Sequence, residues 1–357
     1  MFLQSLAMPI IQSPMLGAAG EALTLAVSKV GGMGSLAAAS MTPAALRAAV
    51  VKLRSETDKP FAINLFVLPP VKADAAEVRD SMARLAPWRE RYGLPAQIIP
   101  NQWAEPFELQ FAALLEAAPP AASFTFGILT HEQVLALKSR GTFVVGTATT
   151  VAEAKAWEAV GADAVCAQGF EAGGHRGTFL KHVGESQIGT LALLSTIREA
   201  IAAPVIAAGG ITDGRAIAAA LAMGAAAVQI GTAYLLAEEA ATSAPWRRAI
   251  AEVADDATHL TRVFSGRYAR GIENDFMREM QEFSDEIPAY PIQNALTQEM
   301  RAAAAKAGDA HALSLWAGQS VKLARPGAAA EITRQLWADA QAALRETTRR
   351  YAGEGSA

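Results

Sequence analysis

Residues 204–232 decide the fold of this chain and read PVIAAGGITDGRAIAAALAMGAAAVQIGT. Two short apolar runs, Val205–Ala208 and Ala227–Ile230, flank an alanine-rich stretch of helical composition. Asp213 is suited to begin that helix and Gly224 is suited to end it. Apolar runs without alternation are typical of strands buried on both faces. The stretch therefore predicts a strand, a helix and a second, parallel strand.

The same unit recurs along the chain before residue 204. Repeated alternation of strand and helix predicts a parallel sheet with right-handed crossovers. Eight strands favour closure into an α/β fold of the (β/α)8 TIM-barrel type, and a doubly wound open sheet is the alternative. The six earlier strand candidates are Ile10–Gln12, Gly34–Ala37, Phe61–Leu65, Phe124–Gly127, Phe143–Gly146 and Ala164–Ala167.

Two regions interrupt this repeat. Residues 69–120 form a long insertion after the third strand, and residues 238–291 follow the last strand with a charged, mostly helical pattern. Both leave the carboxyl ends of strands, where barrel enzymes build their active sites. We therefore expect a barrel over residues 1–237, a mostly helical cap from the insertion and residues 238–291, and C-terminal helices over residues 292–357 that pack on the barrel.

Composition narrows the class of protein. The net charge is −4 and no basic tract is present, so nucleic acid is not an expected partner. The single cysteine, Cys166, excludes an intrachain disulfide and a cysteine-based metal site. Residues 216–237 carry no charge, but Gly224 and Gln229 interrupt them, so we expect a buried helix and strand and no membrane span. We expect a cytoplasmic protein, and a homodimer is left open.

A glycine-rich loop follows the sixth strand. Residues 167–177 read AQGFEAGGHRG and end near a single histidine, His175. Glycine lets the backbone approach a flat ligand closely, and histidine is the side chain best placed to move a proton near neutral pH. Arg176 is expected only to cap a helix or to meet solvent. The other histidines lack a glycine-rich setting and are expected at the surface or in packing roles.

Two further glycine-rich strand ends predict a phosphate site. Gly209 and Gly210 follow the seventh strand, and Gly231 and Thr232 follow the eighth. This pair of loops is where barrels usually bind phosphate through backbone N–H groups and a helix N-terminus. Neither a GxGxxG motif with its acidic residue nor a GxxxxGK[ST] motif is present, so the ligand is more consistent with a mononucleotide such as FMN.

Together these motifs resemble those of the class I nitronate monooxygenases, the FMN-dependent family once called 2-nitropropane dioxygenases. Residues 9–15, PIIQSPM, resemble the family's opening strand, although Ser13 stands where alanine is common. Residues 61–66, FAINLF, resemble its third strand, and residues 167–177 match its most specific motif. Residues 207–211 and 229–232 resemble its phosphate-binding loops.

The resemblance implies an oxidative denitrification of alkyl nitronates of the propionate 3-nitronate type, with O2, to a carbonyl product and nitrite. It implies that His175 is the catalytic base. No metal is expected, because the spacing of the histidines matches no HExxH or similar motif. Because Asn64 is costly in an apolar strand unless it is hydrogen-bonded, a ligand contact there also agrees with the residues. The cofactor-binding set implied by the resemblance is Met15, Asn64, Gln168, Gly173, Gly174, Gly209, Gly210, Gln229, Gly231 and Thr232.

Within that set the implied roles differ. Asn64, Gln168 and Gln229 would hydrogen-bond the flavin, Met15 would pack near its ring, and Gly173 would let the backbone lie against it. Two other functions stay open. An FMN-dependent enoyl-acyl-carrier-protein reductase would share the GGH loop and the phosphate loops but would use NAD(P)H. A non-catalytic flavin-binding protein would not need the histidine.

Overall fold

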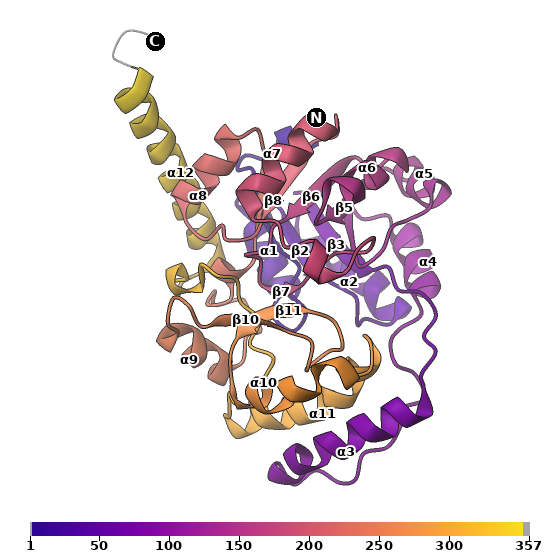
Figure 1. The fold of residues 1–357 in the computed structure, drawn as a ribbon. Helices are drawn as coiled ribbons and strands as arrows, with labels where there is room; N and C mark the ends of the chain where they lie inside the picture. Colours follow the sequence, from indigo (N-terminus) through magenta and orange to yellow (C-terminus); the bar gives the residue numbers. More distant parts are fainter. Residues whose placement is uncertain (1, 353–357) are drawn as a thin grey trace.

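The fold is built around one closed sheet of parallel strands, seen in Figure 1. The structure is a computed structural model and describes residues 2–352. Eight strands lie in the order β1-β9-β8-β6-β5-β4-β3-β2, and a parallel bridge from Ile11 to Met33 closes the sheet between β1 and β2. The (β/α)8 barrel is confirmed and the open sheet is wrong. The strands are β1 (Ile10–Gln12), β2 (Gly34–Ala37), β3 (Phe61–Phe66), β4 (Ala121–Thr125), β5 (Phe143–Ala148), β6 (Ala164–Gln168), β8 (Val205–Ala208) and β9 (Ala227–Ile230).

All eight predicted strands are present, but the fourth is displaced. It was expected over Phe124–Gly127 and instead covers Ala121–Thr125. Phe126 has a positive φ of 78°, so the extended backbone ends before it. The strand begins with alanines, which have low strand propensity, and this hid its start in the sequence.

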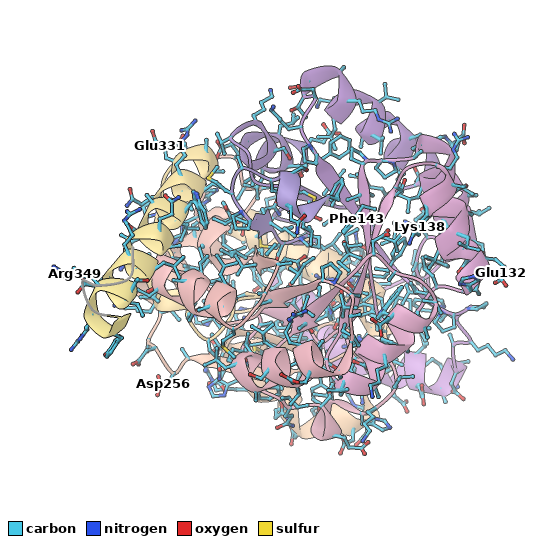
Figure 2. The ribbon with its side chains drawn as sticks, turned by 90° about the horizontal axis from the view of Figure 1, so that it is seen from above. Glu132, Lys138, Phe143, Asp256, Glu331 and Arg349 are labelled. Atoms are coloured by element: carbon cyan, nitrogen blue, oxygen red, sulfur yellow. The ribbon has the colours of Figure 1, made fainter. Side chains whose placement is uncertain are left out.

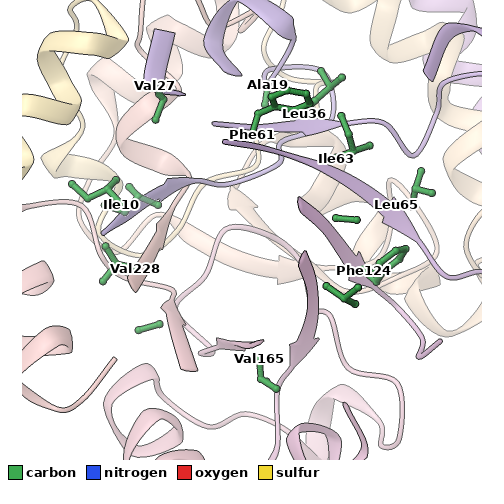
Figure 3. Close-up of a cluster of buried hydrophobic side chains, with 14 of the residues drawn as sticks. Ile10, Ala19, Val27, Leu36, Phe61, Ile63, Leu65, Phe124, Val165 and Val228 are labelled. Atoms are coloured by element: carbon green, nitrogen blue, oxygen red, sulfur yellow. The ribbon is translucent and has the colours of Figure 1, made fainter. Parts of the chain in front are cut away.

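Side chains alternate between two buried layers of the barrel. Figure 3 shows Ile10, Phe61 and Ile63 in the layer between the strands and the surrounding helices. Their neighbours Ile11 and Ala62 belong to a separate cluster inside the barrel. That inner cluster also holds Ala121, Ala164, Cys166, Ala208 and Ala227. Because most of these side chains are small, the barrel interior leaves room for a cavity at its open end.

Helices surround the sheet in the expected order. The helix start predicted at Asp213 is confirmed, because Asp213 accepts a hydrogen bond from Ala216 N, and Thr42 caps α2 in the same way by accepting one from Ala45 N. Such caps satisfy N–H groups that the helix itself leaves unpaired. The barrel helices are α1 (Glu21–Lys29), α2 (Pro43–Glu56), α4 (Phe107–Ala117), α5 (His131–Ser139), α6 (Val151–Ala159), α7 (Thr190–Ala200) and α8 (Gly214–Ala222).

The insertion after β3 is shorter than residues 69–120. Its second helix, α4, packs against α2, and Phe111 and Leu114 are buried in the outer core of the barrel. Helix α4 is therefore the ordinary crossover helix between β3 and β4. Only α3 (Ala75–Arg91) leaves the barrel, and it packs against α11 (Ile292–Ala307).

The region after β9 is less helical than its sequence pattern predicted. It contains α9 (Ala244–Glu252) and α10 (Asp275–Met280), but also β10 (Thr258–Thr261) and β11 (Ala269–Ile272). Strands β10 and β11 are antiparallel, and β11 also pairs with β7, the two-residue strand Gly174–His175. Figure 1 shows this small sheet between the barrel and the helices α10 and α11. The sheet joins the histidine loop of the barrel to the cap.

The C-terminal helices divide between two places. Helix α11 contributes Leu296 and Met300 to a second core cluster, together with Trp88 of α3 and Phe276 of α10, so it belongs to the cap. Helix α12 (Ala329–Ala352) packs on α8 and α1 of the barrel, and Figure 1 shows it running outward to the C-terminus. Of the helices expected over residues 292–357, α12 packs on the barrel and α11 packs in the cap. Residues 353–357 lie outside the described residues.

The outer surface is polar. Figure 2 shows Glu132 and Glu331 at the periphery of the molecule, and both side chains are exposed. Within residues 2–352, no helix is long and apolar enough to cross a membrane. The same described residues contain no group of three or more histidine, cysteine or acidic side chains that could hold a metal ion.

Candidate active site

A cavity of about 410 Å³ opens at the carboxyl ends of the barrel strands and is covered by the cap. This volume lies in the range of small-molecule sites. Its floor reaches Cys166 and Ala208 of the inner cluster, so it extends into the barrel. Every residue predicted for the site lines this one cavity: Met15, Asn64, Gln168, Gly173, Gly174, His175, Gly209, Gly210, Gln229, Gly231 and Thr232.

One end of the cavity is lined by backbone N–H groups. Those of Gly209, Gly210, Gly231 and Thr232 donate to no group among residues 2–352. Gly209 and Gly210 have φ of 112° and 69°, a conformation that glycine adopts readily. Amide groups that point into a cavity without partners form a site for an anion.

The helix at this end differs from the expected one. Asp213 caps α8 by accepting a hydrogen bond from Ala216 N at 2.9 Å. The carboxylate of Asp213 therefore occupies the position at the N-terminus of α8 that a phosphate would otherwise take. The short helix η3 (Thr232–Tyr234) begins directly at the cavity instead. A short extra helix after the eighth strand is the usual partner of the two phosphate loops in barrels.

The glycine at position 173 has a packing role that the sequence did not reveal. A Cβ there would lie 2.5 Å from Gly318 N and 2.6 Å from the carbonyl carbon of Ala317. The backbone of residues 317–318 therefore occupies the space next to Gly173. By contrast, a Cβ on Gly174 would meet open space, although its φ of 71° also favours glycine. Gly173 lines the cavity, but its missing side chain serves the contact with the C-terminal segment.

Three amide side chains line the cavity, and they differ in how many hydrogen bonds they already make within the protein. Asn64 is only 3% exposed and donates through Nδ2 to Ser123 O at 3.2 Å and Ser123 Oγ at 3.0 Å. Gln168 donates to His175 O at 3.0 Å and accepts from Gly177 N at 2.8 Å, so its amide shapes the histidine loop. Gln229 makes no side-chain hydrogen bond within the described part of the chain, which leaves its amide available to a ligand.

Arg176 is buried and holds the glycine-rich loop in place through hydrogen bonds. The expectation that it caps a helix or contacts solvent is wrong. Its side chain has an exposed fraction of 0%. It donates to Gln168 O at 2.8 Å, Gly169 O at 2.7 Å and Ser186 O at 2.9 Å. The glycine-rich loop turns these carbonyl groups inward, where each needs a donor. Arg176 supplies the donors and fixes the loop that carries His175.

The imidazole of His175 sits among aromatic side chains. Its ring centroid lies 5.4 Å from that of Trp316, 5.5 Å from Phe126 and 5.7 Å from Tyr290. Its Nε2 lies 2.8 Å from Ser265 Oγ. Burial lowers the pKa of His175 to about 3, with further lowering from Arg267 and Arg301. The ring is therefore neutral at neutral pH and can accept a proton.

Two partly buried arginines, Arg267 and Arg301, give the cavity region a positive charge. Arg301 lines the cavity and donates to Asn294 O and Oδ1, both at 2.9 Å, and to Thr297 Oγ1 at 3.2 Å. The guanidinium carbon of Arg267 lies 4.0 Å from the ring centroid of Phe126. Neither arginine forms an ion pair with a carboxylate of residues 2–352, and burial lowers the pKa of each to about 10. A buried cation without an anion is costly, so an anionic ligand is favoured here.

The cap residues of the site were missed by sequence reasoning. The missed residues that contact His175 or line the cavity include Ser265, Tyr290, Arg301, Trp316, Gly318 and Ser320. Residues 265–267 read Ser-Gly-Arg, which predicts a turn, but nothing in that pattern indicates which loop the turn faces. Nine of the 35 residues that line the cavity, from Trp246 to Ser320, thus come from the cap and the C-terminal segment.

Comparison with known proteins agrees with this geometry. The sequence model of the family described as nitronate monooxygenase matches residues 2–339. A probable nitronate monooxygenase of Staphylococcus saprophyticus subsp. saprophyticus is 40% identical over 317 residues, which cover 88% of this chain and 89% of that protein. A probable nitronate monooxygenase of Staphylococcus aureus is 38% identical over 321 residues, which cover 90% of each.

Solved structures give the same picture. A nitroalkane oxidase from Streptomyces ansochromogenes superposes with a TM-score of 0.89 at 38% identity and covers 97% of this chain and 99% of its own. FabK from Thermotoga maritima superposes with a TM-score of 0.75 at 29% identity and covers 98% of this chain and 97% of its own. With the family match over nearly the whole chain and the shared barrel, the chain belongs to the nitronate monooxygenase family and is an oxidoreductase.

Proposed function

We propose that this chain is an FMN-dependent nitronate monooxygenase that converts an alkyl nitronate of the propionate 3-nitronate type and O2 into a carbonyl compound and nitrite. One observation carries the proposal: a single cavity joins backbone amides that have no partner among residues 2–352, a neutral histidine, and an arginine that forms no ion pair with those residues. The amides suit a phosphate, the histidine suits proton transfer, and the arginine suits an anionic substrate.

The residues present fit FMN. The free N–H groups of Gly209, Gly210, Gly231 and Thr232 would hold its phosphate. Asn64 and Gln229 would hydrogen-bond the ring or the ribityl chain, with Gln168 beside them, and Met15 would pack near the ring. Gly173 and Gly174 would complete the wall next to His175. When bound, FMN would accept electrons from the substrate and pass them to O2.

The chain's own side chains would bind and prepare the substrate. Arg301, with Arg267 behind Phe126, would attract the negatively charged nitronate. Phe126 and Trp316 would pack against its alkyl part and exclude water. A neutral nitroalkane must first lose a proton from its α-carbon, and the uncharged imidazole of His175 is placed to take that proton. We propose that the cap, including α11, forms the substrate side of the site.

Two alternatives make different demands on this cavity. An enoyl-acyl-carrier-protein reductase must use NAD(P)H, whereas the curated relatives above are named as nitronate monooxygenases at higher identity. A non-catalytic flavin-binding protein has no use for a histidine held between aromatic rings. The monooxygenase therefore agrees best with both the relatives and the site.

Anaerobic mixing of the purified protein with substrate tests the proposal. We expect propionate 3-nitronate to bleach the flavin absorbance, and we expect NADH to leave it unchanged over the same time. Bleaching by NADH alone would favour the reductase. A protein that binds FMN and responds to neither compound would favour the non-catalytic alternative.

A second experiment isolates the role of His175. Replacing His175 with Asn removes the base but keeps a polar side chain of similar size. We expect turnover of a neutral nitroalkane to fall by roughly a hundredfold or more, the usual size of a general-base contribution. Turnover of the preformed nitronate should change far less, because its α-proton is already gone. Equal losses with both substrates would exclude the general-base role.

A further inference from the structure

Ser265 contacts the imidazole of His175 from the cap. It lies in the turn between β10 and β11, is 1% exposed, and places its Oγ 2.8 Å from His175 Nε2. The two residues are 90 positions apart in the chain. The small cap sheet brings the two residues together. His175 lies in β7 and pairs with Ala269 of β11, the strand that follows the turn of Ser265.

The turn that carries Ser265 is tightly fixed. Ser265 N and Gly266 N both donate to Arg262 O, at 3.2 and 2.7 Å. Gly266 has a φ of 80°, and a Cβ there would lie 2.1 Å from Pro288 O, so the turn packs directly on the segment before Tyr290. A serine on such a turn has little freedom to move away from the histidine.

The hydrogen bonds of Ser265 determine which group donates to which. Its Oγ lies 3.0 Å from Arg267 O, a carbonyl that can only accept, and it also receives Arg267 N–H at 3.3 Å. Arg267 O accepts no other hydrogen bond from residues 2–352. If the single hydroxyl proton turned to His175, this carbonyl would lose its donor. The hydroxyl proton therefore goes to Arg267 O, and Ser265 Oγ accepts from His175.

We propose that Ser265 is a positioning residue that holds His175 as the Nε2–H tautomer, so that Nδ1 is the nitrogen that takes the α-proton of a neutral nitroalkane. The inference rests on the proposed function. In the step, the α-carbon loses a proton to Nδ1, the C–H electron pair forms the C=N bond of the nitronate, and the N=O π pair moves onto the nitro oxygen, which takes the negative charge. The imidazolium keeps its Nε2–H bond to Ser265 and later releases the Nδ1 proton to solvent.

Other observations agree with this assignment. Nδ1 of His175 makes no hydrogen bond to any residue that the structure describes, so its lone pair is not already used. The imidazole is neutral near pH 7, so it carries one proton, and that proton cannot be on both nitrogens. Fixing a histidine tautomer through the nitrogen remote from the reaction is a general way to orient a base.

The test compares Ser265→Ala with Ser28→Ala in the full chain. Ser28 is also buried and also both donates, to Pro60 O at 2.9 Å, and accepts, from Gly34 N at 3.0 Å, but it lies at the opposite end of the barrel. We expect Ser265→Ala to lower kcat/KM for a neutral nitroalkane by roughly tenfold to hundredfold. Turnover of preformed nitronate should stay within about twofold, and Ser28→Ala should change the ratio of the two activities little. Ser265→Thr, which keeps the hydroxyl, should recover the ratio.

A second readout does not depend on activity. Long-range 1H–15N correlation spectra of histidine-labelled protein, with His175→Asn for assignment, report which ring nitrogen carries the proton. We expect a protonated Nε2 and a bare Nδ1 in the wild type and a mixture in Ser265→Ala. A protonated Nδ1 in the wild type, or equal effects of Ser265→Ala on both substrates, would overturn the inference. If nitronate fails to bleach the flavin, the proposed function fails, and the spectra still decide the tautomer.

Discussion

The hydroxyl oxygen of Thr232 accepts a hydrogen bond from the backbone N–H of Gly318 at 3.0 Å. Thr232 begins η3 directly after the last barrel strand, whereas Gly318 lies 86 residues later, beyond the cap. The contact joins the C-terminal segment to the amide-lined end of the cavity. Because Gly318 occupies a lone pair of the hydroxyl, the proton of Thr232 Oγ1 is available to an anion.

The first prediction concerns Gly173→Ala, because Gly173 packs against the segment that contains Gly318. The added Cβ would lie 2.5 Å from Gly318 N, so residues 317–318 must move away from the amide-lined end of the cavity. We expect weaker FMN binding, by tenfold or more, and a loss of roughly 1–3 kcal/mol in the free energy of unfolding, as for overpacking. Fluorescence titration with FMN and urea unfolding measure the two effects.

Gly184→Ala is the matched control for this prediction. A Cβ at Gly184 meets nothing within 4 Å and its φ is ordinary, so FMN affinity should stay at the wild-type value. Wild-type FMN affinity in Gly173→Ala would show that residues 317–318 do not shape the cofactor site.

A second prediction concerns the buried carboxylate of Glu153. Its Oε2 accepts from Thr149 N at 2.6 Å and Thr149 Oγ1 at 2.7 Å. Its Oε1 accepts from Thr178 Oγ1 at 2.9 Å, Phe179 N at 2.6 Å and Leu180 N at 3.0 Å. Glu153→Gln replaces one acceptor oxygen with an NH2 donor that faces these donors. We expect a loss of about 3 kcal/mol in the free energy of urea unfolding.

This network also holds the loop after His175 to helix α6. Glu199→Gln, at an exposed position of α7, should leave stability within about 0.5 kcal/mol of the wild type. If Glu153→Gln were as stable as Glu199→Gln, the carboxylate would not be the group that holds residues 178–180. Limited proteolysis within that segment gives an independent check.

The barrel was predictable because its strands carry their own signals. Runs such as Val205–Ala208 are apolar throughout and end in glycines, and both features follow from burial on two faces and from the turns that follow. The cap sheet lacks those signals. Strand β11 contains Arg270, which is 4% exposed and donates to Thr258 O and Phe170 O of other segments. Read alone, its sequence is that of an exposed loop.

The candidate site also consists of a barrel part that the sequence predicted and a cap part that it did not. The barrel half, from Asn64 to Thr232, follows from residues placed directly at strand ends, where a fold prediction also places them in space. The cap half depends on contacts such as His175 to Ser265, which no local pattern specifies. Arg176 was predicted to be exposed because a charged side chain in a loop usually contacts solvent. It is buried because carbonyl groups of the loop face inward and need its N–H donors.

Arg301 gives a third prediction, on substrate charge. Arg301→Met removes a partly buried cation that lines the cavity. A hydrogen bond to a charged group contributes about 1.5–3 kcal/mol, so we expect KM for propionate 3-nitronate to rise by roughly tenfold to a hundredfold. KM for a neutral nitroalkane should change much less. Steady-state kinetics with both substrates measures the difference.

Two further variants make this test specific. Arg301→Lys keeps the positive charge and should recover part of the affinity for the nitronate, although lysine lacks the planar fork of donors. Arg349→Met removes an exposed charge from α12 and should leave both KM values unchanged. An equal rise of KM for the charged and neutral substrates would show that Arg301 shapes the cavity without selecting for charge.

The low pKa of His175 gives the last prediction, on stability against pH. The unfolded chain binds a proton at His175 with a pKa near 6.5, whereas the folded chain does so only at about 3. Between these values the unfolded state binds more protons, so acid favours unfolding. Above pH 6.5 the protonation of His175 has little effect on the free energy of unfolding. As the pH falls from 6.5 toward 3, that free energy decreases progressively, by about 2 kcal/mol at pH 5.

Urea unfolding at pH 7 and pH 5 measures this contribution when the wild type is compared with His175→Asn. Groups other than His175 titrate in both proteins, so their effect cancels in the difference. We expect the wild type to lose about 2 kcal/mol more than His175→Asn between the two pH values. His175→Gln should behave like His175→Asn. Parallel losses in all three proteins would mean that the folded chain protonates His175 as readily as the unfolded chain, and the imidazole would then not be a neutral base at pH 5.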